Sequence, residues 1–153
     1  MPVEVALPFV MLTIAGLLAF WRGGPPERAA AIIIAALIVT DVSYHLRFGP
    51  SGFVDVDPVH LLLDGSELVA ITVLAMRANR VWPLWAAAAQ LICFSGHIAA
   101  LIEPGGMSLA YWAMTQIPLL IQLIALGFGV VAHARRERRI GPYRSWRSRE
   151  ARA

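Results

Sequence analysis

The residues of this chain that could do chemistry fall at helical spacings inside apolar stretches. His60, Asp64 and Glu67 occupy positions i, i+4 and i+7 of the segment VHLLLDGSELVAITVLAM. Asp41 and His45 occupy positions i and i+4 near the end of the apolar stretch before it. Residues three, four or seven positions apart share one face of a helix. Each pair of His and Asp can therefore present its ligand atoms to a single ion.

A metal ion is the first ligand that this set of side chains indicates. Three histidines with one or two carboxylates suit zinc, and also Cu(II), Fe or Mn. The expected metal ligands are His45, His60, Asp64 and His97, with Asp41 and Glu67 as further ligands or as hydrogen-bond partners of the ligands. Zinc with an open coordination position activates water. Glu67 or Asp64 would then be the general base of a membrane-embedded, metal-dependent hydrolase.

Two other interpretations of the same residues stay open. A b-type haem could be held between two of His45, His60 and His97, since ligation by two histidines is common in membrane electron-transfer bundles. The acids and histidines could also pair only with one another and with Gln90 and nearby polar side chains, which would hold the helices in register without any ligand. Ionisable residues inside a membrane nevertheless point to function. Whether the protein is an enzyme stays open.

The elements that position these residues follow from composition. Hydrophobic residues make up 58% of the 153 residues and charged residues only 15%, which is too apolar for a soluble domain and typical of a polytopic membrane protein. Crossing about 30 Å of hydrocarbon takes about 20 residues in a helix. Stretches rich in Gly and Pro break the chain between apolar segments of about that length. The expected membrane helices are residues 3–21, 29–48, 59–77, 83–102 and 108–132.

The arginines decide whether the acidic third segment crosses the bilayer. If residues 59–77 cross, twelve of the thirteen basic residues fall on one side and only Arg47 falls on the other, which agrees with the positive-inside rule. The sequence therefore predicts an all-α bundle of five transmembrane helices over residues 1–134, with the N-terminus outside. A basic cytoplasmic tail, residues 135–153, follows. Arginine without lysine suggests a bacterium of high GC content, and hence a multi-pass protein of the bacterial inner membrane.

In this topology the candidate ligands gather in the outer leaflet. The half of the bundle nearer the arginines is expected to hold almost no buried polar groups, apart from Glu27 and His133 at the interface. The expected function is an integral membrane protein that binds a metal at the outer cluster or serves as a small subunit of a complex. Its expected partners are the lipid bilayer, anionic lipid at the basic tail and other membrane subunits, but not nucleic acid.

Residues 80–104, RVWPLWAAAAQLICFSGHIAALIEP, carry one further pattern. A basic residue, a W-P-L-W motif, an alanine-rich stretch, a Gln and a His follow one another on one expected helix. This pattern resembles a loosely defined group of small, uncharacterised bacterial polytopic membrane proteins. The residues concerned are Arg80, Trp82, Pro83, Trp85, Gln90 and His97. The resemblance implies a membrane helix and no particular activity, and it draws attention to Gln90 and His97.

Overall fold

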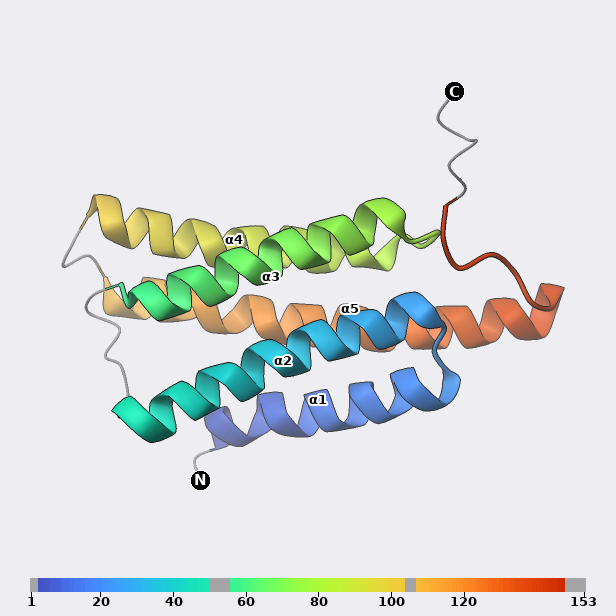
Figure 1. Ribbon diagram of the computed structural model, residues 1–153, viewed down its shortest axis with the longest axis horizontal. Coiled ribbons are helices and arrows are strands. Elements are labelled where there is room, and N and C mark those ends of the chain that lie inside the picture. The colour runs from blue at the N-terminus through green and yellow to red at the C-terminus, as the bar shows by residue number, and fades with distance from the viewer. Residues whose placement is uncertain (1–2, 50–55, 104–106, 148–153) are drawn as a thin grey trace.

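The protein is a bundle of five α-helices (Figure 1). The computed structural model describes residues 3–49, 56–103 and 107–147. Its helices are α1 (Val3–Arg22), α2 (Pro25–Phe48), α3 (Pro58–Arg77), α4 (Trp82–Ile102) and α5 (Ser108–Ile140). These residues form no strand, only an isolated bridge between Ala78 and Trp146. The predicted all-α class is confirmed, and each helix contains one of the five expected segments.

The helix starts are set by proline and by capping side chains. Proline stands in the first turn of α2, α3 and α4, where its missing N–H breaks no hydrogen bond. The Asp57 side chain caps α3 by accepting a hydrogen bond from the Val59 N–H at 2.8 Å. The helix α2 begins at Pro25, four residues before the expected start at 29, because the two prolines open the helix instead of interrupting it. The turn before α2 is therefore only Gly23 and Gly24.

The last helix extends well beyond its expected end at residue 132. It continues through the arginines to Ile140 and ends at Gly141, whose φ is +75°. The next residues fold back onto the turn between α3 and α4, where the Arg147 N–H donates to the Arg77 carbonyl at 2.9 Å. The first residues of the expected tail are thus helical and the next are docked on the bundle. Residues 148–153 of that tail lie outside the described residues.

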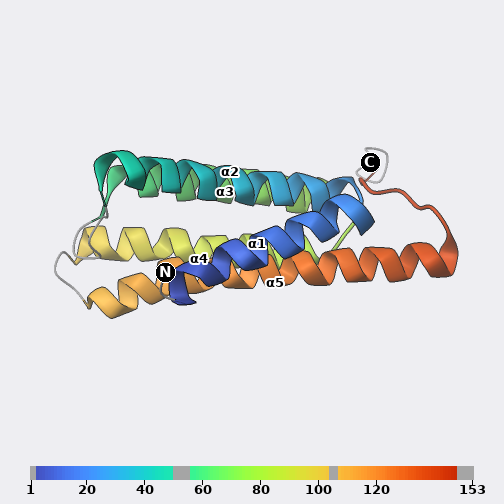
Figure 2. The same ribbon diagram turned by 90° about the horizontal axis from the view of Figure 1, so that it is seen from below.

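The helices pack in two layers with α1 across one side. In Figure 2, α2 and α3 lie above α4 and α5, while α1 runs obliquely over α5. The core between them is made of small and branched apolar side chains, including Ile34, Ile71 and Leu126. A Cβ atom on Gly129 of α5 would lie 2.5 Å from the Trp82 indole nitrogen. Only glycine therefore lets α4 approach α5 this closely.

The outer surface of the bundle is apolar. Four of the helices, α2 to α5, are long and apolar enough to cross a membrane, and residues Leu7–Arg22 of α1 form a shorter apolar helix. Large apolar side chains such as Leu62 and Phe128 point outward and are more than 70% exposed. Such exposure is costly in water but suits contact with lipid. The fold is that of a multi-pass membrane protein.

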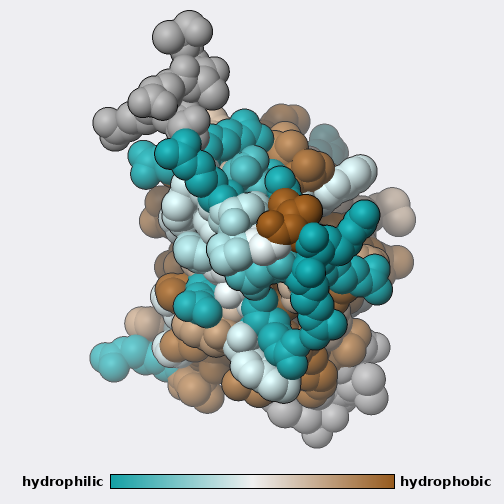
Figure 3. All heavy atoms as spheres, turned by 90° about the vertical axis from the view of Figure 1, so that its right-hand side faces the viewer, coloured by the Kyte–Doolittle hydropathy of each residue, from teal (hydrophilic) through white to brown (hydrophobic). Residues whose placement is uncertain are grey.

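The two ends of the bundle differ in chemistry. One end, at the left of Figure 1, carries the last turns of α2 and the first turns of α3 and is called here the histidine end. The opposite end carries the α1–α2 and α3–α4 turns and the extension of α5, and is called the arginine end. Polar side chains gather on the arginine end when it is viewed along the bundle (Figure 3).

Candidate functional site

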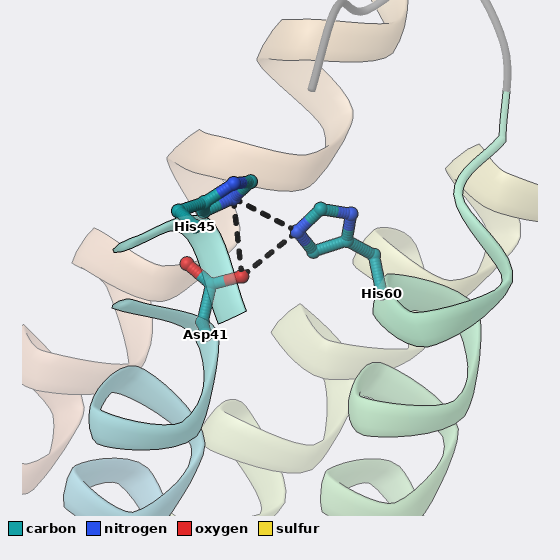
Figure 4. A group of neighbouring side chains, drawn as sticks. All are labelled: Asp41, His45 and His60. Atoms are coloured by element: carbon teal, nitrogen blue, oxygen red, sulfur yellow. Dashed lines mark hydrogen bonds and ion pairs between the residues drawn. The ribbon is translucent and has the colours of Figure 1, made fainter. Parts of the chain in front are cut away.

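Three candidate ligands meet at the histidine end, and they are called here the open triad: Asp41, His45 and His60. Two of them come from the last turns of α2 and the third from the first turn of α3 (Figure 4). The His60 Nε2 atom lies 2.8 Å from the Asp41 Oδ1 atom and 3.1 Å from the His45 Nε2 atom. The remaining side of the triangle, from His45 Nε2 to Asp41 Oδ1, measures 3.6 Å. The side chains are 19–34% exposed, so an ion can reach them.

The hydrogen bond on the far side of His45 fixes which ring nitrogen carries a lone pair. Its Nδ1 atom lies 3.0 Å from the Gly49 carbonyl. A carbonyl can only accept, so Nδ1 carries the hydrogen and Nε2 of the neutral ring is a bare acceptor. Gly49 has a φ of +87°, a backbone conformation that side chains disfavour. Glycine at this position therefore has two effects. It ends helix α2, and its carbonyl orients the His45 ring.

Asp57 supports His60 in a similar way. The Asp57 Oδ2 atom lies 3.6 Å from the His60 Nδ1 atom and accepts a hydrogen bond from the Tyr44 hydroxyl at 2.9 Å. Burial of Asp57 raises the pKa of its carboxyl, but hydrogen bonds from the Val59 N–H and the Tyr44 hydroxyl lower that pKa by more, so it lies below its ordinary value. Asp57 is therefore charged at neutral pH and lies on the Nδ1 side of the His60 ring, while Nε2 faces the triad.

The ligand atoms of the open triad are spaced as in a tetrahedral metal site. Ligands about 2.0 Å from a tetrahedral zinc lie about 3.3 Å from one another. The three distances of the triad, 2.8, 3.1 and 3.6 Å, bracket that value. With a hydrogen on His60 Nδ1, three acceptor atoms converge and one metal ion can bind all three. With the hydrogen on Nε2 instead, His60 donates to Asp41 Oδ1 at 2.8 Å.

A second group of possible ligands lies deeper in the bundle and consists of Asp64, Cys93 and His97. It is called here the buried triad, and its hydrogen-bonding groups have other partners than those of the open triad. The His97 Nε2 atom lies 2.7 Å from the Asp64 Oδ2 atom. Its Nδ1 atom lies 2.8 Å from the Tyr111 hydroxyl. Both ring nitrogens of His97 are therefore occupied by protein groups. The expectation that Asp64 and His97 meet inside the bundle is confirmed, and their geometry is that of a hydrogen-bonded network.

That network continues across the middle of the bundle through two glutamines. Gln90 donates to Asp64 Oδ1 at 3.0 Å, and Gln122 donates to Gln90 Oε1 at 2.6 Å. Two buried acceptors next to it have no hydrogen-bond partner in the described part of the chain, namely Glu67 Oε1 and Gln122 Oε1. Only 3% of Glu67 and 1% of Gln122 is exposed. Leaving such atoms unpaired costs free energy, so the network is incomplete at this point.

Five of the six expected site residues are thus divided between the two triads, and the sixth, Glu67, lies beside the buried triad. His60 was expected to pair with Asp64 on its own helix, but its nitrogens face Asp41 and Asp57 instead. Among the described residues, the two groups of possible metal ligands share no member. Cys93 belongs to the second group, and its Sγ atom lies 3.7 Å from the Thr115 carbonyl oxygen. Helical periodicity places residues on a face but does not tell which neighbouring helix supplies the partner.

The arginine end holds a buried polar network that sequence reasoning missed. Glu27 is fully buried and accepts hydrogen bonds from the Trp82 indole at 2.9 Å, the Arg80 guanidinium at 3.3 Å and the Gly24 N–H at 3.0 Å. His133, with 7% exposed, accepts from Arg80 at 3.2 Å and from the Tyr143 hydroxyl at 2.8 Å. The expectation of an almost apolar inner half is therefore wrong. An ion pair and hydrogen bonds therefore connect the helices at the arginine end.

The motif on residues 80–104 contained the missing signal. Its Arg80 and Trp82 contact Glu27, and its Gln90 and His97 contact Asp64. One helix thus supplies polar partners to buried acids on both α2 and α3. A helix with arginine and tryptophan at its start and glutamine and histidine further along indicates carboxylates on the helices beside it.

Haem does not fit the open triad. A porphyrin ring has to lie between its two axial imidazoles. The facing nitrogens of His45 and His60 are only 3.1 Å apart and leave no space for a ring. The third histidine, His97, uses both nitrogens elsewhere.

Similarity to other proteins gives no further indication of function. The pattern on residues 80–104 stays a resemblance, because no protein-family model matches the chain and neither a curated protein nor a solved structure is significantly similar to it.

Proposed function

We propose that this protein is a five-span protein of the bacterial inner membrane that binds a divalent transition metal, zinc foremost, at the open triad. One observation carries the proposal: three acceptor atoms of Asp41, His45 and His60 converge within 2.8–3.6 Å. The Gly49 carbonyl and the Asp57 carboxylate behind the two rings have the role that such partners have in metal sites, where they fix the tautomer and the ring orientation. The partial exposure of the triad leaves a coordination position open.

The proposed orientation places the open triad on the outer side of the membrane. Of the thirteen arginines, ten lie at the arginine end, Arg47 lies at the other end, and two fall in residues 148–153. Positive residues favour the cytoplasmic side. The N-terminus would then be outside, the arginine end would face the cytoplasm, and the metal would bind from the periplasm.

Metal content tests the proposal directly. Wild-type protein, stripped with EDTA and titrated with zinc in detergent, should bind one zinc per chain and melt at a higher temperature when loaded. Zinc present at one hundred times its Kd stabilises the folded state by about 2.7 kcal/mol. His60→Gln should lose both the zinc and the response to EDTA. The matched control is His97→Gln, which should be less stable but should keep its zinc, because His97 belongs to the buried triad.

Two outcomes would contradict the metal site. A wild type that binds no zinc and ignores EDTA would mean that a proton on His60 Nε2 holds the open triad together. Loss of zinc in His97→Gln but not in His60→Gln would move the site to the buried triad.

Metal-dependent hydrolysis is not part of the proposal. A hydrolase needs a general base beside the metal-bound water. Asp64 was expected in that role but accepts hydrogen bonds from His97 and Gln90. Glu67, the other candidate, is buried near Gln122. We therefore propose metal binding alone, by a membrane protein or by a small subunit of a complex.

A further inference from the structure

A pocket of about 370 Å³ opens at the arginine end, between the α1–α2 turn, the extension of α5 and the docked tail. It lies at the polar end face of the bundle, seen in Figure 3, opposite the open triad. The side chains of Arg22, Arg28 and Arg138 line it, together with Trp21, Glu137 and Tyr143. None of these residues takes part in the proposed metal site.

The positive charge in this pocket is not neutralised by the protein. Within the described residues, no carboxylate lies within 4.0 Å of the guanidinium of Arg22, Arg28 or Arg138, whereas Arg80 nearby is paired with Glu27. The one acid in the pocket wall, Glu137, lies 3.9 Å from the His133 Nε2 atom. Three arginines and a single glutamate therefore line one cavity among the described residues. Such a site favours an anion.

The arginine side chains supply the positively charged donors of this pocket, and His133 and Ser145 also line it. Helix N-termini often bind anions through free N–H groups, but at the start of α2 the Gly24 N–H donates to Glu27 and two prolines follow. The Tyr143 hydroxyl donates to His133. The guanidinium fork matches the oxygen atoms of a phosphate group in charge and in geometry. A phosphate group is therefore the anion that this pocket fits.

The position of Trp21 indicates where the phosphate comes from. Trp21 is 72% exposed on the rim of the pocket, and the Arg22 guanidinium lies 4.4 Å from the centre of its ring. Exposed tryptophans of membrane proteins lie at the level of the lipid headgroups. The pocket opens where α1 and α2 leave the apolar part of the bundle. We propose that it binds the phosphate headgroup of one anionic phospholipid.

This proposal is more specific than attraction of lipid to a basic tail. Two of its three arginines lie at the α1–α2 turn and not in the tail. Other arginines of the same end, such as Arg139 and Arg144, do not line the pocket. They therefore allow a control with the same change in net charge.

The test is a lipid-binding measurement on the full-length chain in detergent, by native mass spectrometry with phosphatidylglycerol or phosphatidylcholine added. Wild-type protein should retain one phosphatidylglycerol and no phosphatidylcholine. The double variant Arg22→Gln with Arg28→Gln should bind phosphatidylglycerol roughly tenfold more weakly. The double variant Arg139→Gln with Arg144→Gln should bind it like wild type. If the first double variant does not fold, the single variant Arg138→Gln replaces it.

Three results would overturn the proposal. Equal weakening in both double variants would mean general attraction to positive charge. Equal retention of the two lipids by wild type would mean that the pocket does not recognise the headgroup charge. Displacement of phosphatidylglycerol by millimolar inorganic phosphate at constant ionic strength would mean that the site serves a soluble phosphate.

Discussion

His45 shows how one residue can be prepared for metal binding by a backbone feature. Its Nδ1 hydrogen is held by the Gly49 carbonyl, and this carbonyl is in place because Gly49 adopts a φ of +87°. The same hydrogen bond directs the Nε2 lone pair toward Asp41 and His60. His97 has the opposite arrangement, because both of its nitrogens are occupied. His45 therefore has a ring nitrogen that can bind a metal ion, and His97 does not, although both lie on apolar helices.

Gly49→Ala should weaken zinc binding about tenfold, since partners behind a metal ligand commonly contribute that much. A side chain at φ +87° is strained, so the peptide should rotate and withdraw its carbonyl from His45. Zinc titration monitored by metal content checks this. Gly16→Ala is the control, because a Cβ atom there would meet nothing within 4 Å. Unchanged affinity in Gly49→Ala would show that the carbonyl does not orient the ring.

Glu67→Gln should raise the melting temperature of the protein. Glu67 Oε1 and Gln122 Oε1 are buried acceptors without a donor, and an amide at position 67 would bring N–H groups to them. A recovered hydrogen bond contributes about 1 kcal/mol, and the substitution also removes the cost of burying a carboxyl. Thermal unfolding in detergent checks the direction. A lower melting temperature would mean that the carboxylate already holds a cation.

At the level of single residues, the sequence predicted which side chains gather in the two clusters but not their partners. All six candidates lie at or beside one of the two triads, since ionisable residues on apolar helices have few other reasons to occur. The pairing of His60 with Asp41 could not be predicted, because it depends on the rotation of α2 against α3. Glu27 was placed at the interface because it stands next to a turn. Its burial follows from Arg80 and Trp82, which are more than fifty residues away.

The helices themselves were more predictable than their contacts. Apolar length and the Gly- and Pro-rich breaks located all five helices, because crossing a membrane demands about 20 apolar residues whatever the tertiary structure. The extension of α5 to Ile140 carries no apolar signal, since Arg135 to Arg139 lie beyond the apolar stretch. Arginine and glutamate are good helix formers, and the helix continues until Gly141 ends it. Hydropathy thus predicts where a membrane ends better than where a helix ends.

The stability of the start of α3 depends on pH through the carboxyl group of Asp57. Its carboxylate caps the helix through the Val59 N–H, and its pKa in the folded protein is below the ordinary value of 3.8. A lowered pKa means that the charged form stabilises the fold. This stabilisation is complete above the ordinary pKa and is lost as the pH falls through the lower, folded-state value.

Comparison of wild type with Asp57→Asn isolates this effect, since asparagine also caps helices well. The wild type should be the more stable protein at neutral pH, and the difference should shrink only below about pH 4. Melting temperatures measured across this range check it. A difference that already disappears near pH 6 would implicate the histidines of the open triad instead.

For the molecule as a whole, the distribution of arginines predicts the topology. Reporter proteins that are active only in the cytoplasm should be active when fused after the last residue, since the arginine end is expected inside. The same reporter placed in the segment between α2 and α3 should be inactive. An active reporter between α2 and α3 in a stably inserted fusion would reverse the topology and put the open triad in the cytoplasm.

The separation of charges along the bundle also makes the molecule an electric dipole. Ten arginines lie at one end, and Asp41, Asp57 and Asp64 lie in or beside the two triads toward the other. Moving one elementary charge against a membrane potential of 100 mV costs about 2.3 kcal/mol. In an energised membrane that is negative inside, the voltage would therefore favour the orientation with the arginine end on the inner side. Vesicles reconstituted without a voltage lack this constraint, and the protein can insert into them in both directions.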